Sequence, residues 1–179
     1  MKTADGAAVV GIAGWSGAGK TTFLEKLVHE LKGRGYRVGT VKHTTHEGAL
    51  DVPGSDSYRH FEAGSDMVTL VGSRQLAIFE RLEEGLGLEQ VVARVSGVDI
   101  LLVEGYKRAR FPKVEVSRWG VPEWSRLVSH PEDLLAVVTD RPWSVGVPCY
   151  ELDDAAGVAD LLVQRGLLAP KTLLRPNFA

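Results

Sequence analysis

The chain has 179 residues, of which 44% are hydrophobic and 25% charged, and its formal net charge is -2 at pH 7. This length fits one ordinary domain with a sizeable core. The near balance of 21 basic and 23 acidic residues argues against nucleic acid as a partner and against an acidic interaction tail. The single cysteine, Cys149, excludes an internal disulfide, and we interpret it as a small buried hydrophobic residue.

The N-terminal residues Met1 to Gly6 contain no apolar core of signal-peptide length, and no stretch of the sequence approaches the length of a membrane-spanning helix. We therefore expect a cytoplasmic protein without membrane association. The hydrophobic pattern favours one domain over residues 1–168. Periodicity is lost over residues 169–179, so we expect a peripheral C-terminal tail there.

A glycine-rich segment with the pattern G-x-x-x-x-G-K-T lies between a predicted strand, Ala8–Ala13, and a predicted helix. The helix is indicated by Phe23, Leu27 and Leu31, which recur at helical spacing. Strand, loop and helix in this order predict a phosphate-binding loop for a nucleoside triphosphate. The segment consists of Gly14, Trp15, Ser16, Gly17, Ala18, Gly19, Lys20, Thr21 and Thr22.

Each defined position of that pattern has a chemical reason. Gly14 and Gly19 allow backbone angles at which successive N–H groups converge on phosphate oxygens. The helix N-terminus directs its unpaired N–H groups and its positive dipole end at the same phosphates. We expect Lys20 to lie across the β- and γ-phosphates and the Thr21 hydroxyl to bind Mg²⁺.

Periodicity and turn residues predict the remaining elements. We expect strands at residues 36–42, 66–71, 75–80, 98–105, 112–117, 134–140 and 147–152, and helices at 55–63, 88–95 and 155–164. Residues 75–80 alternate like a half-exposed edge strand, and residues 112–117 alternate like a strand with outward charges. The polar residues 43–57 form a loop that we expect to cover the phosphate loop.

Glu104 ends an apolar strand that the sequence predicts to be buried on both faces. Its carboxylate should emerge beside the phosphate loop, where an acid orders Mg²⁺ or its water shell. The alternative is a solvent-exposed Glu in a turn. Lys107 to Arg110 form a basic cluster that either meets a phosphate-bearing ligand or, as we favour, is a solvated loop.

Several stretches together resemble the MobB proteins of molybdopterin-guanine dinucleotide biosynthesis. The combination of Lys42-His43-x-x-His46 with Pro53-Gly54-x-Asp56-Ser57 is more particular than the phosphate loop, which many nucleotide-binding proteins share. The resemblance reaches from about Val9 to the closing helix. The matching stretches are residues 14–22, 41–46, 51, 53–59, 62–64, 102–107 and 112–114.

This resemblance implies a P-loop NTPase fold, a three-layer α/β/α arrangement with a mostly parallel central sheet and an additional edge strand or hairpin. It also implies a homodimer that binds GTP, hydrolyses it weakly with Mg²⁺ and assists the MobA guanylyltransferase, which joins GMP to molybdopterin. Molybdopterin itself is a possible ligand. The family is similar in architecture to dethiobiotin synthetases, where an acid after the second strand joins the metal ligands. Asp51 is the candidate for that acid beside Thr21 and Glu104, with Asp56 second.

Other polar residues near the predicted phosphate site have open roles. Lys42, at a strand end, is either a cation that offsets charge on the phosphates or a surface lysine. His43 and His46 make a poor zinc site without a third ligand, and we expect them to form a loop facing the γ-phosphate or a second substrate. Arg59 either contacts a phosphate or pairs with Asp56. Trp15 is either a lid on a partner subunit or a residue without a role.

Thr139 and Asp140 end a buried strand and are the candidates for guanine recognition, because a carboxylate accepts from both guanine N1–H and its exocyclic amine. The Asn-Lys-x-Asp guanine signature is absent, so GTP over ATP rests on the resemblance. Trp119 and Trp124 lie in a connection whose role the sequence does not reveal.

No residue is an obvious base for activating water, so we expect Lys20, Glu104 and Lys42 to support only slow hydrolysis by an accessory factor. The alternative function is a stand-alone small-molecule kinase or an ATP-dependent ligase resembling dethiobiotin synthetase. Such an enzyme predicts fast turnover once its acceptor is added, and residues 107–110 are its only candidate for a basic lid.

Overall fold

The computed structural model describes residues 1–44, 48–120, 125–141 and 143–171. The chain forms two compact units, a larger one of Met1–His43 with Leu88–Ala179 and a smaller one of Thr44–Gly87. Among the described residues, no helix is long and apolar enough to cross a membrane.

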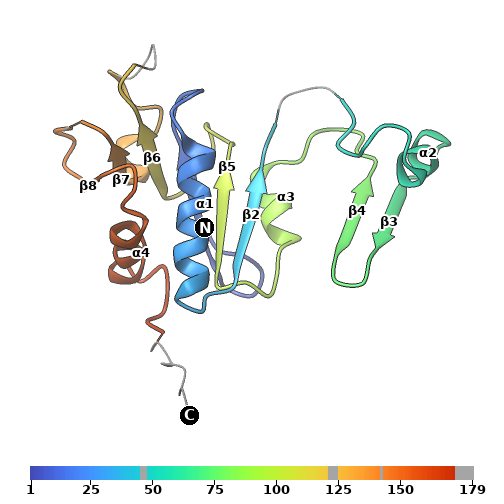
Figure 1. Cartoon of the computed structure of the whole chain (residues 1–179), viewed down its shortest axis with the longest axis horizontal. Helices are drawn as coiled ribbons and strands as arrows, with labels where there is room; N and C mark the ends of the chain where they lie inside the picture. The colour runs from blue at the N-terminus through green and yellow to red at the C-terminus, as the bar shows by residue number, and fades with distance from the viewer. Residues whose placement is uncertain (45–47, 121–124, 142, 172–179) are drawn as a thin grey trace. The chain divides into compact units, whose positions relative to one another are not determined.

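A six-stranded sheet with the order β2-β5-β1-β6-β7-β8 organises the larger unit, and every neighbouring pair in it is parallel (Figure 1). The carboxyl ends of its strands therefore meet at one edge, where α/β proteins place their ligands. The strands are β1 (Ala8–Ala13), β2 (Val38–Lys42), β5 (Ile100–Glu104), β6 (Lys113–Ser117), β7 (Leu134–Thr139) and β8 (Cys149–Tyr150).

Helices cover both faces of this sheet. Successive side chains of a buried strand point to opposite faces, so one strand contributes to two apolar clusters. On β1, Val10 packs in one apolar cluster with Leu27 of α1 (Lys20–Gly33) and Leu162 of α4 (Ala155–Gln164). Val9 packs in a second cluster with Leu88 of α3 (Leu88–Ala93). The predicted three-layer α/β/α fold with a mostly parallel sheet is thus confirmed.

The prediction of outward charges on residues 112–117 is wrong. Lys113 and Glu115 are each 1% exposed, because β6 lies between β1 and β7 and both of its faces are covered. The Glu115 carboxylate accepts hydrogen bonds from the backbone N–H groups of Val128 at 2.6 Å and Ser129 at 2.8 Å. The Lys113 ammonium donates to the carbonyl of Ala109 at 2.5 Å. Each buried charge is therefore satisfied largely by backbone groups.

The smaller unit contains α2 (Asp56–Glu62) and an antiparallel hairpin of β3 (Met67–Val71) and β4 (Leu76–Glu80). Ser55 is the N-cap of α2, as predicted, and its hydroxyl accepts from the backbone N–H of Tyr58 at 3.1 Å. The two strands pair only with each other in a sheet of their own. The additional element expected from the sequence is therefore a hairpin rather than an edge strand of the central sheet.

The C-terminal end of the described chain is anchored to the larger unit. The Tyr36 hydroxyl donates to the Ala169 carbonyl at 2.7 Å, and the Lys171 ammonium forms an ion pair with Asp99 at 2.6 Å. Cys149 is exposed, which corrects its interpretation as a buried residue. It begins the two-residue strand β8 at the sheet edge, where only one neighbouring strand covers it.

We predict that Glu115→Ala lowers the free energy of unfolding by about 2–4 kcal/mol, because it leaves two N–H groups without their charged acceptor. Urea unfolding followed by circular dichroism measures this change. The matched control is Glu25→Ala on the exposed side of α1, which should change stability by less than about 0.5 kcal/mol. Equal effects of the two substitutions would contradict the structural role of Glu115.

Candidate functional site

The glycine-rich loop between β1 and α1 lies directly against the end of β6. Gly14 has a φ of 136°, and a Cβ atom at this position would lie 2.2 Å from the carbonyl oxygen of Val116. Gly17 and Gly19 also have positive φ angles, 78° and 91°. These conformations favour glycine, and they give the loop the path that brings backbone N–H groups to the helix start.

The first turn of α1 carries the groups that suit an anion. Gly19 is the N-cap in a left-handed conformation, and the N-cap makes no side-chain hydrogen bond to the first helical turn. The Lys20 ammonium donates to the Trp15 carbonyl at 2.7 Å and thus folds back over the loop. Burial lowers the pKa of Lys20, the neighbouring charge of Lys107 lowers it further, and Glu104 opposes these effects. An anion at this position would relieve the crowding of positive charge.

Three predicted site residues from three elements meet at the carboxyl edge of the sheet. The Thr21 hydroxyl on α1 lies 3.2 Å from Glu104 Oε2 and 3.4 Å from Oε1. Lys42, the register neighbour of Glu104 on β2, forms an ion pair with Oε1. The Glu104 side chain is only 6% exposed, whereas that of Lys42 is 61% exposed. The alternative of a solvent-exposed Glu104 is therefore wrong.

The donor set around Glu104 fits Mg²⁺ better than zinc. In the described part of the chain, no group of three or more His, Cys, Asp or Glu side chains could hold a metal ion. Mg²⁺ needs no such cage, since one or two carboxylates complete its shell together with water and substrate phosphates. The Glu104 carboxylate and the Thr21 hydroxyl supply suitable oxygens beside the loop. His43 contributes a backbone N–H bond to the Glu104 carbonyl at 2.8 Å, and His46 lies outside the described residues.

The two candidate acids of the predicted loop belong to the smaller unit, and their metal role stays a prediction. Asp51 accepts from the Val52 N–H at 2.7 Å and from the Ser55 hydroxyl at 3.3 Å. Hydrogen bonds, chiefly the one from Ser57, hold the pKa of Asp51 below its usual value. Asp56 lies 3.7 Å from Arg59, the helical pair that the sequence offered as an alternative to phosphate contact.

Thr139 and Asp140 line a pocket of about 580 Å³ at the carboxyl ends of β7 and β8. Asp140 Oδ1 accepts from the backbone N–H of Trp119 at 2.9 Å. The Arg141 guanidinium carbon lies 4.1 Å from the centre of the Trp119 ring. Trp119 thus contacts two residues that line this pocket, and Trp124 lies outside the described residues.

Trp15 is tied into the larger unit, a role that the sequence did not reveal. Its indole N–H donates to the carbonyl of Arg126 at 2.8 Å. The Arg126 guanidinium lies 5.0 Å and the Lys107 ammonium 5.8 Å from the ring centre. The signal in the sequence for this contact is the basic cluster at residues 107–110.

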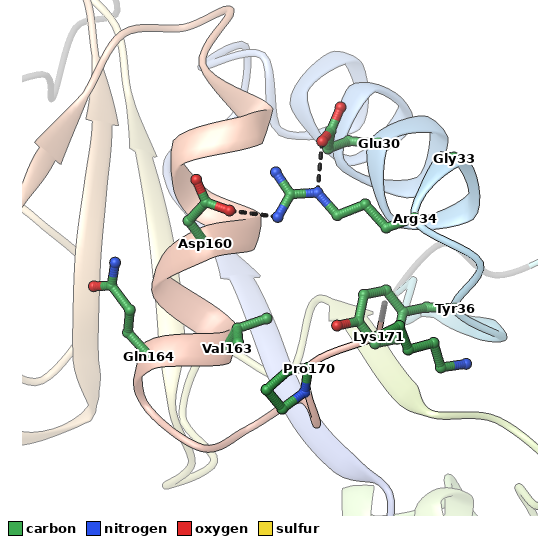
Figure 2. A pocket seen from close by; sticks show the side chains of 9 residues that line it. All are labelled: Glu30, Gly33, Arg34, Tyr36, Asp160, Val163, Gln164, Pro170 and Lys171. Carbon is green, nitrogen blue, oxygen red and sulfur yellow. Dashed lines mark hydrogen bonds and ion pairs between the residues drawn. The ribbon is translucent and has the colours of Figure 1, made fainter. Parts of the chain in front are cut away.

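A separate pocket of about 740 Å³ lies between the C-terminal end of α1 and α4 (Figure 2). There Arg34 bridges Glu30, at 2.7 Å, and Asp160. Because α1 has 14 residues, its two ends are about 20 Å apart, and this pocket contains none of the predicted site residues.

A strand, a glycine loop and a helix at the carboxyl edge of a parallel sheet define a P-loop α/β protein. Comparison with known proteins agrees. Residues 9–140 match the family model of MobB, molybdopterin guanine dinucleotide synthesis protein B. Because this match spans most of the chain, the protein belongs to the MobB family.

Two curated relatives are molybdopterin-guanine dinucleotide biosynthesis adapter proteins. That of Escherichia coli (strain K12) is 34% identical over 160 residues, which are 87% of this chain and 91% of the relative. That of Haemophilus influenzae is 34% identical over 156 residues, 86% of each chain.

Solved structures of MobB proteins have the same fold. Bacillus subtilis MobB has a TM-score of 0.66 and 26% identity, with 90% of this chain and 98% of that chain covered. A MobB homolog from Bacillus stearothermophilus has a TM-score of 0.62 and 27% identity, with 88% and 96% covered.

We predict that Gly14→Ala is about 1–3 kcal/mol more destabilising than Gly17→Ala, as measured by urea unfolding. Both positions have positive φ, so both variants carry backbone strain. Only at Gly14 does the new Cβ meet a backbone carbonyl, whereas at Gly17 nothing lies within 4 Å. Equal losses at the two positions would show that the loop does not rest on β6 as described.

Proposed function

We propose that the protein is a nucleotide-dependent adapter, which binds GTP with Mg²⁺ and assists a MobA-type guanylyltransferase in attaching GMP to molybdopterin. The observation that carries this proposal is the meeting of Thr21, Lys42 and Glu104 at the mouth of the glycine loop, in a chain of the MobB family. The adapter names of the relatives support the biosynthetic role.

Phosphate binding follows from the loop and its cations. The N–H groups of the first helical turn have no intrahelical partners and face the loop that Gly14 and Gly19 shape. Lys20 is partly desolvated beside other lysines, so its ammonium gains more from a polyanion than an exposed lysine does. The triphosphate therefore lies along residues 14–22 with Lys20 across its terminal phosphates.

Thr21 and Glu104 would hold Mg²⁺ in this proposal, and the metal role of Asp51 stays a prediction from the sequence. When bound, the metal neutralises charge on the β- and γ-phosphates. Glu104 contributes a carboxylate that is already buried and oriented by two neighbours. Lys42 keeps that carboxylate in place and adds a positive charge beside the phosphates.

Hydrolysis is slow in this proposal, because the two buried carboxylates of β5 and β6 are already engaged by other groups. Glu104 is engaged by Lys42 and Thr21, and Glu115 is buried on two backbone N–H groups. Phosphoryl transfer depends on positioned charge rather than on a strong base. Nucleotide binding is then the working state, and hydrolysis returns the adapter to its starting state.

Guanine is selected at the pocket of Thr139 and Asp140. Its volume of about 580 Å³ is in the range of small-ligand sites. Asp140 Oδ1 already accepts from Trp119, but each carboxylate oxygen has a second lone pair. Both oxygens can therefore accept from the N1–H and amino group of guanine, whereas adenine presents an acceptor at N1.

The test is calorimetric binding of GTP and ATP with Mg²⁺, followed by single-turnover hydrolysis with and without the guanylyltransferase and molybdopterin. We expect GTP preference, slow intrinsic hydrolysis and physical association with the guanylyltransferase. Lys20→Ala should weaken GTP binding roughly 100-fold and leave the fold intact. ATP preference, or fast turnover with a small acceptor in the absence of the guanylyltransferase, would instead indicate a kinase or ligase.

For Glu104→Gln we predict that the Mg²⁺ concentration needed for half-maximal GTP binding rises at least roughly tenfold, since the amide keeps the shape but loses the charge. A metal titration at fixed GTP measures this. Glu25→Gln, on the exposed side of α1, is the control and should leave the titration unchanged. An unaltered titration in Glu104→Gln would remove this residue from the metal site.

We also propose that the protein is a homodimer joined through the β3–β4 hairpin. The register places Met67, Val71, Leu76 and Ile78 on one face of the hairpin, together with Thr69 and Glu80. The four apolar side chains are 55%, 74%, 63% and 55% exposed. Exposed apolar patches of this kind mark interaction sites, and a two-stranded sheet alone is marginally stable. A second copy of the same hairpin, related by twofold symmetry, would cover the apolar side chains and stabilise the two-stranded sheet.

Sedimentation velocity tests the dimer. We predict that Ile78→Lys converts the dimer to monomer, because it places an ammonium in the centre of the apolar face. Glu83→Lys is the control, since it adds an ammonium to an exposed position outside both strands. A wild-type monomer, or an unchanged dimer in Ile78→Lys, would exclude the hairpin as the interface.

A further inference from the structure

Two cations lie against the Trp15 indole at the phosphate loop, and the proposed function uses neither. The distances to the ring centre are 5.8 Å for the Lys107 ammonium and 5.0 Å for the Arg126 guanidinium. Trp15 is itself held at two points, by the bond from Lys20 to its carbonyl and by the bond from its indole N–H to Arg126. The indole is thus a fixed support for positive charge beside the loop.

The backbone that carries Lys107 is constrained on its way out of β5. Gly105 has a φ of 118°, and a Cβ atom there would lie 2.6 Å from that of His43. Tyr106 follows with a φ of 45°, the left-handed region that costs a non-glycine residue about 1–2 kcal/mol. Its ring packs against that of His43 at a tilt of 40°, with centroids 4.2 Å apart. Strain of this kind persists at functional sites, and here it directs the chain after Glu104 toward Trp15.

The charges of Lys107 and Arg126 are not neutralised by carboxylates in the described part of the chain. The nearby carboxylates are already engaged, Glu104 by Lys42 and Glu115 by backbone N–H groups. Arg110 provides the contrast within the same basic cluster, because it pairs with Glu132 at 2.8 Å and with Asp133 at 2.7 Å. Lys107 and Lys20 are close enough to repel each other, so the site is built for an added anion.

We propose that Lys107 contacts the terminal phosphate of the triphosphate held by residues 14–22, and that Trp15 is the positioning residue for this contact. The inference rests on the proposed nucleotide site. Phosphoryl-transfer sites place a cation on the γ-phosphoryl group, in some proteins an arginine of the same chain and in others one from a partner. Lys107 has this function here, with Arg126 as a second positive charge against the same indole.

A γ-phosphate contact distinguishes triphosphate from diphosphate. We expect Lys107→Ala to weaken binding of a nonhydrolysable GTP analogue roughly 10- to 100-fold in calorimetry with Mg²⁺. Binding of GDP should change less than about twofold. Lys107→Arg should retain most of the preference for the GTP analogue over GDP, because it keeps a cation at the Trp15 indole. Arg108→Ala is the matched control, because it removes an exposed positive charge next to Lys107. It should leave the affinities for the GTP analogue and for GDP unchanged.

Trp15→Leu tests the positioning role, since leucine keeps apolar bulk but removes the indole that supports both cations. It should lower the affinity for the analogue more than that for GDP, whereas a merely structural role would lower both equally.

Two results would overturn the inference in distinguishable ways. If the unchanged protein binds neither nucleotide, the proposed function fails and this contact with it. If the unchanged protein binds both but Lys107→Ala behaves like Arg108→Ala, the phosphate loop stands and the Lys107 contact is wrong. Circular dichroism of each variant excludes loss of the fold as the cause.

Discussion

The buried carboxylate of Glu104 is the interaction on which the site depends. A carboxylate that is 6% exposed must be paired, and here a hydroxyl from α1 and an ammonium from β2 satisfy it. This arrangement ties three elements together at the carboxyl edge of the sheet. It also fixes the beginning of the turn that carries Tyr106 and Lys107, so the position of one acid sets both the proposed metal site and the proposed phosphate contact.

Hydrophobic periodicity predicted most elements of the fold, because the central strands are continuous apolar stretches and α1 and α4 have a clear apolar side. It failed on β6, where Lys113 and Glu115 alternate with valines and imitate a half-exposed strand. Their partners are backbone groups outside β6, in the preceding loop for Lys113 and at residues 128 and 129 for Glu115, which an alternating pattern does not encode. Cys149 was misjudged for a related reason, since its exposure depends on β8 being the last strand of the sheet.

The sequence likewise predicted only part of the candidate site. It predicted that Glu104 and Lys42 emerge at the carboxyl edge beside the glycine-rich loop, and the structure brings them together there, because a strand-end position in a parallel sheet specifies where a side chain emerges. It did not identify Trp15, Arg126 and Lys107 as a group, because the left-handed turn at Tyr106 has no sequence signal. The division of the chain into domains and the metal role of Asp51 or Asp56 stay predictions, since the latter two belong to the smaller unit.

The edge of the sheet around the glycine-rich loop is rich in fixed positive charge, and its buried carboxylates are engaged by other groups, which suits holding a triphosphate more than cleaving it quickly. A crystal structure of the protein with a nonhydrolysable GTP analogue and Mg²⁺ tests this most directly. The account predicts the β- and γ-phosphates against the N–H groups of residues 17–22, with Mg²⁺ between the Thr21 hydroxyl and Glu104. Phosphates bound elsewhere, or a metal that does not approach Glu104, would contradict it.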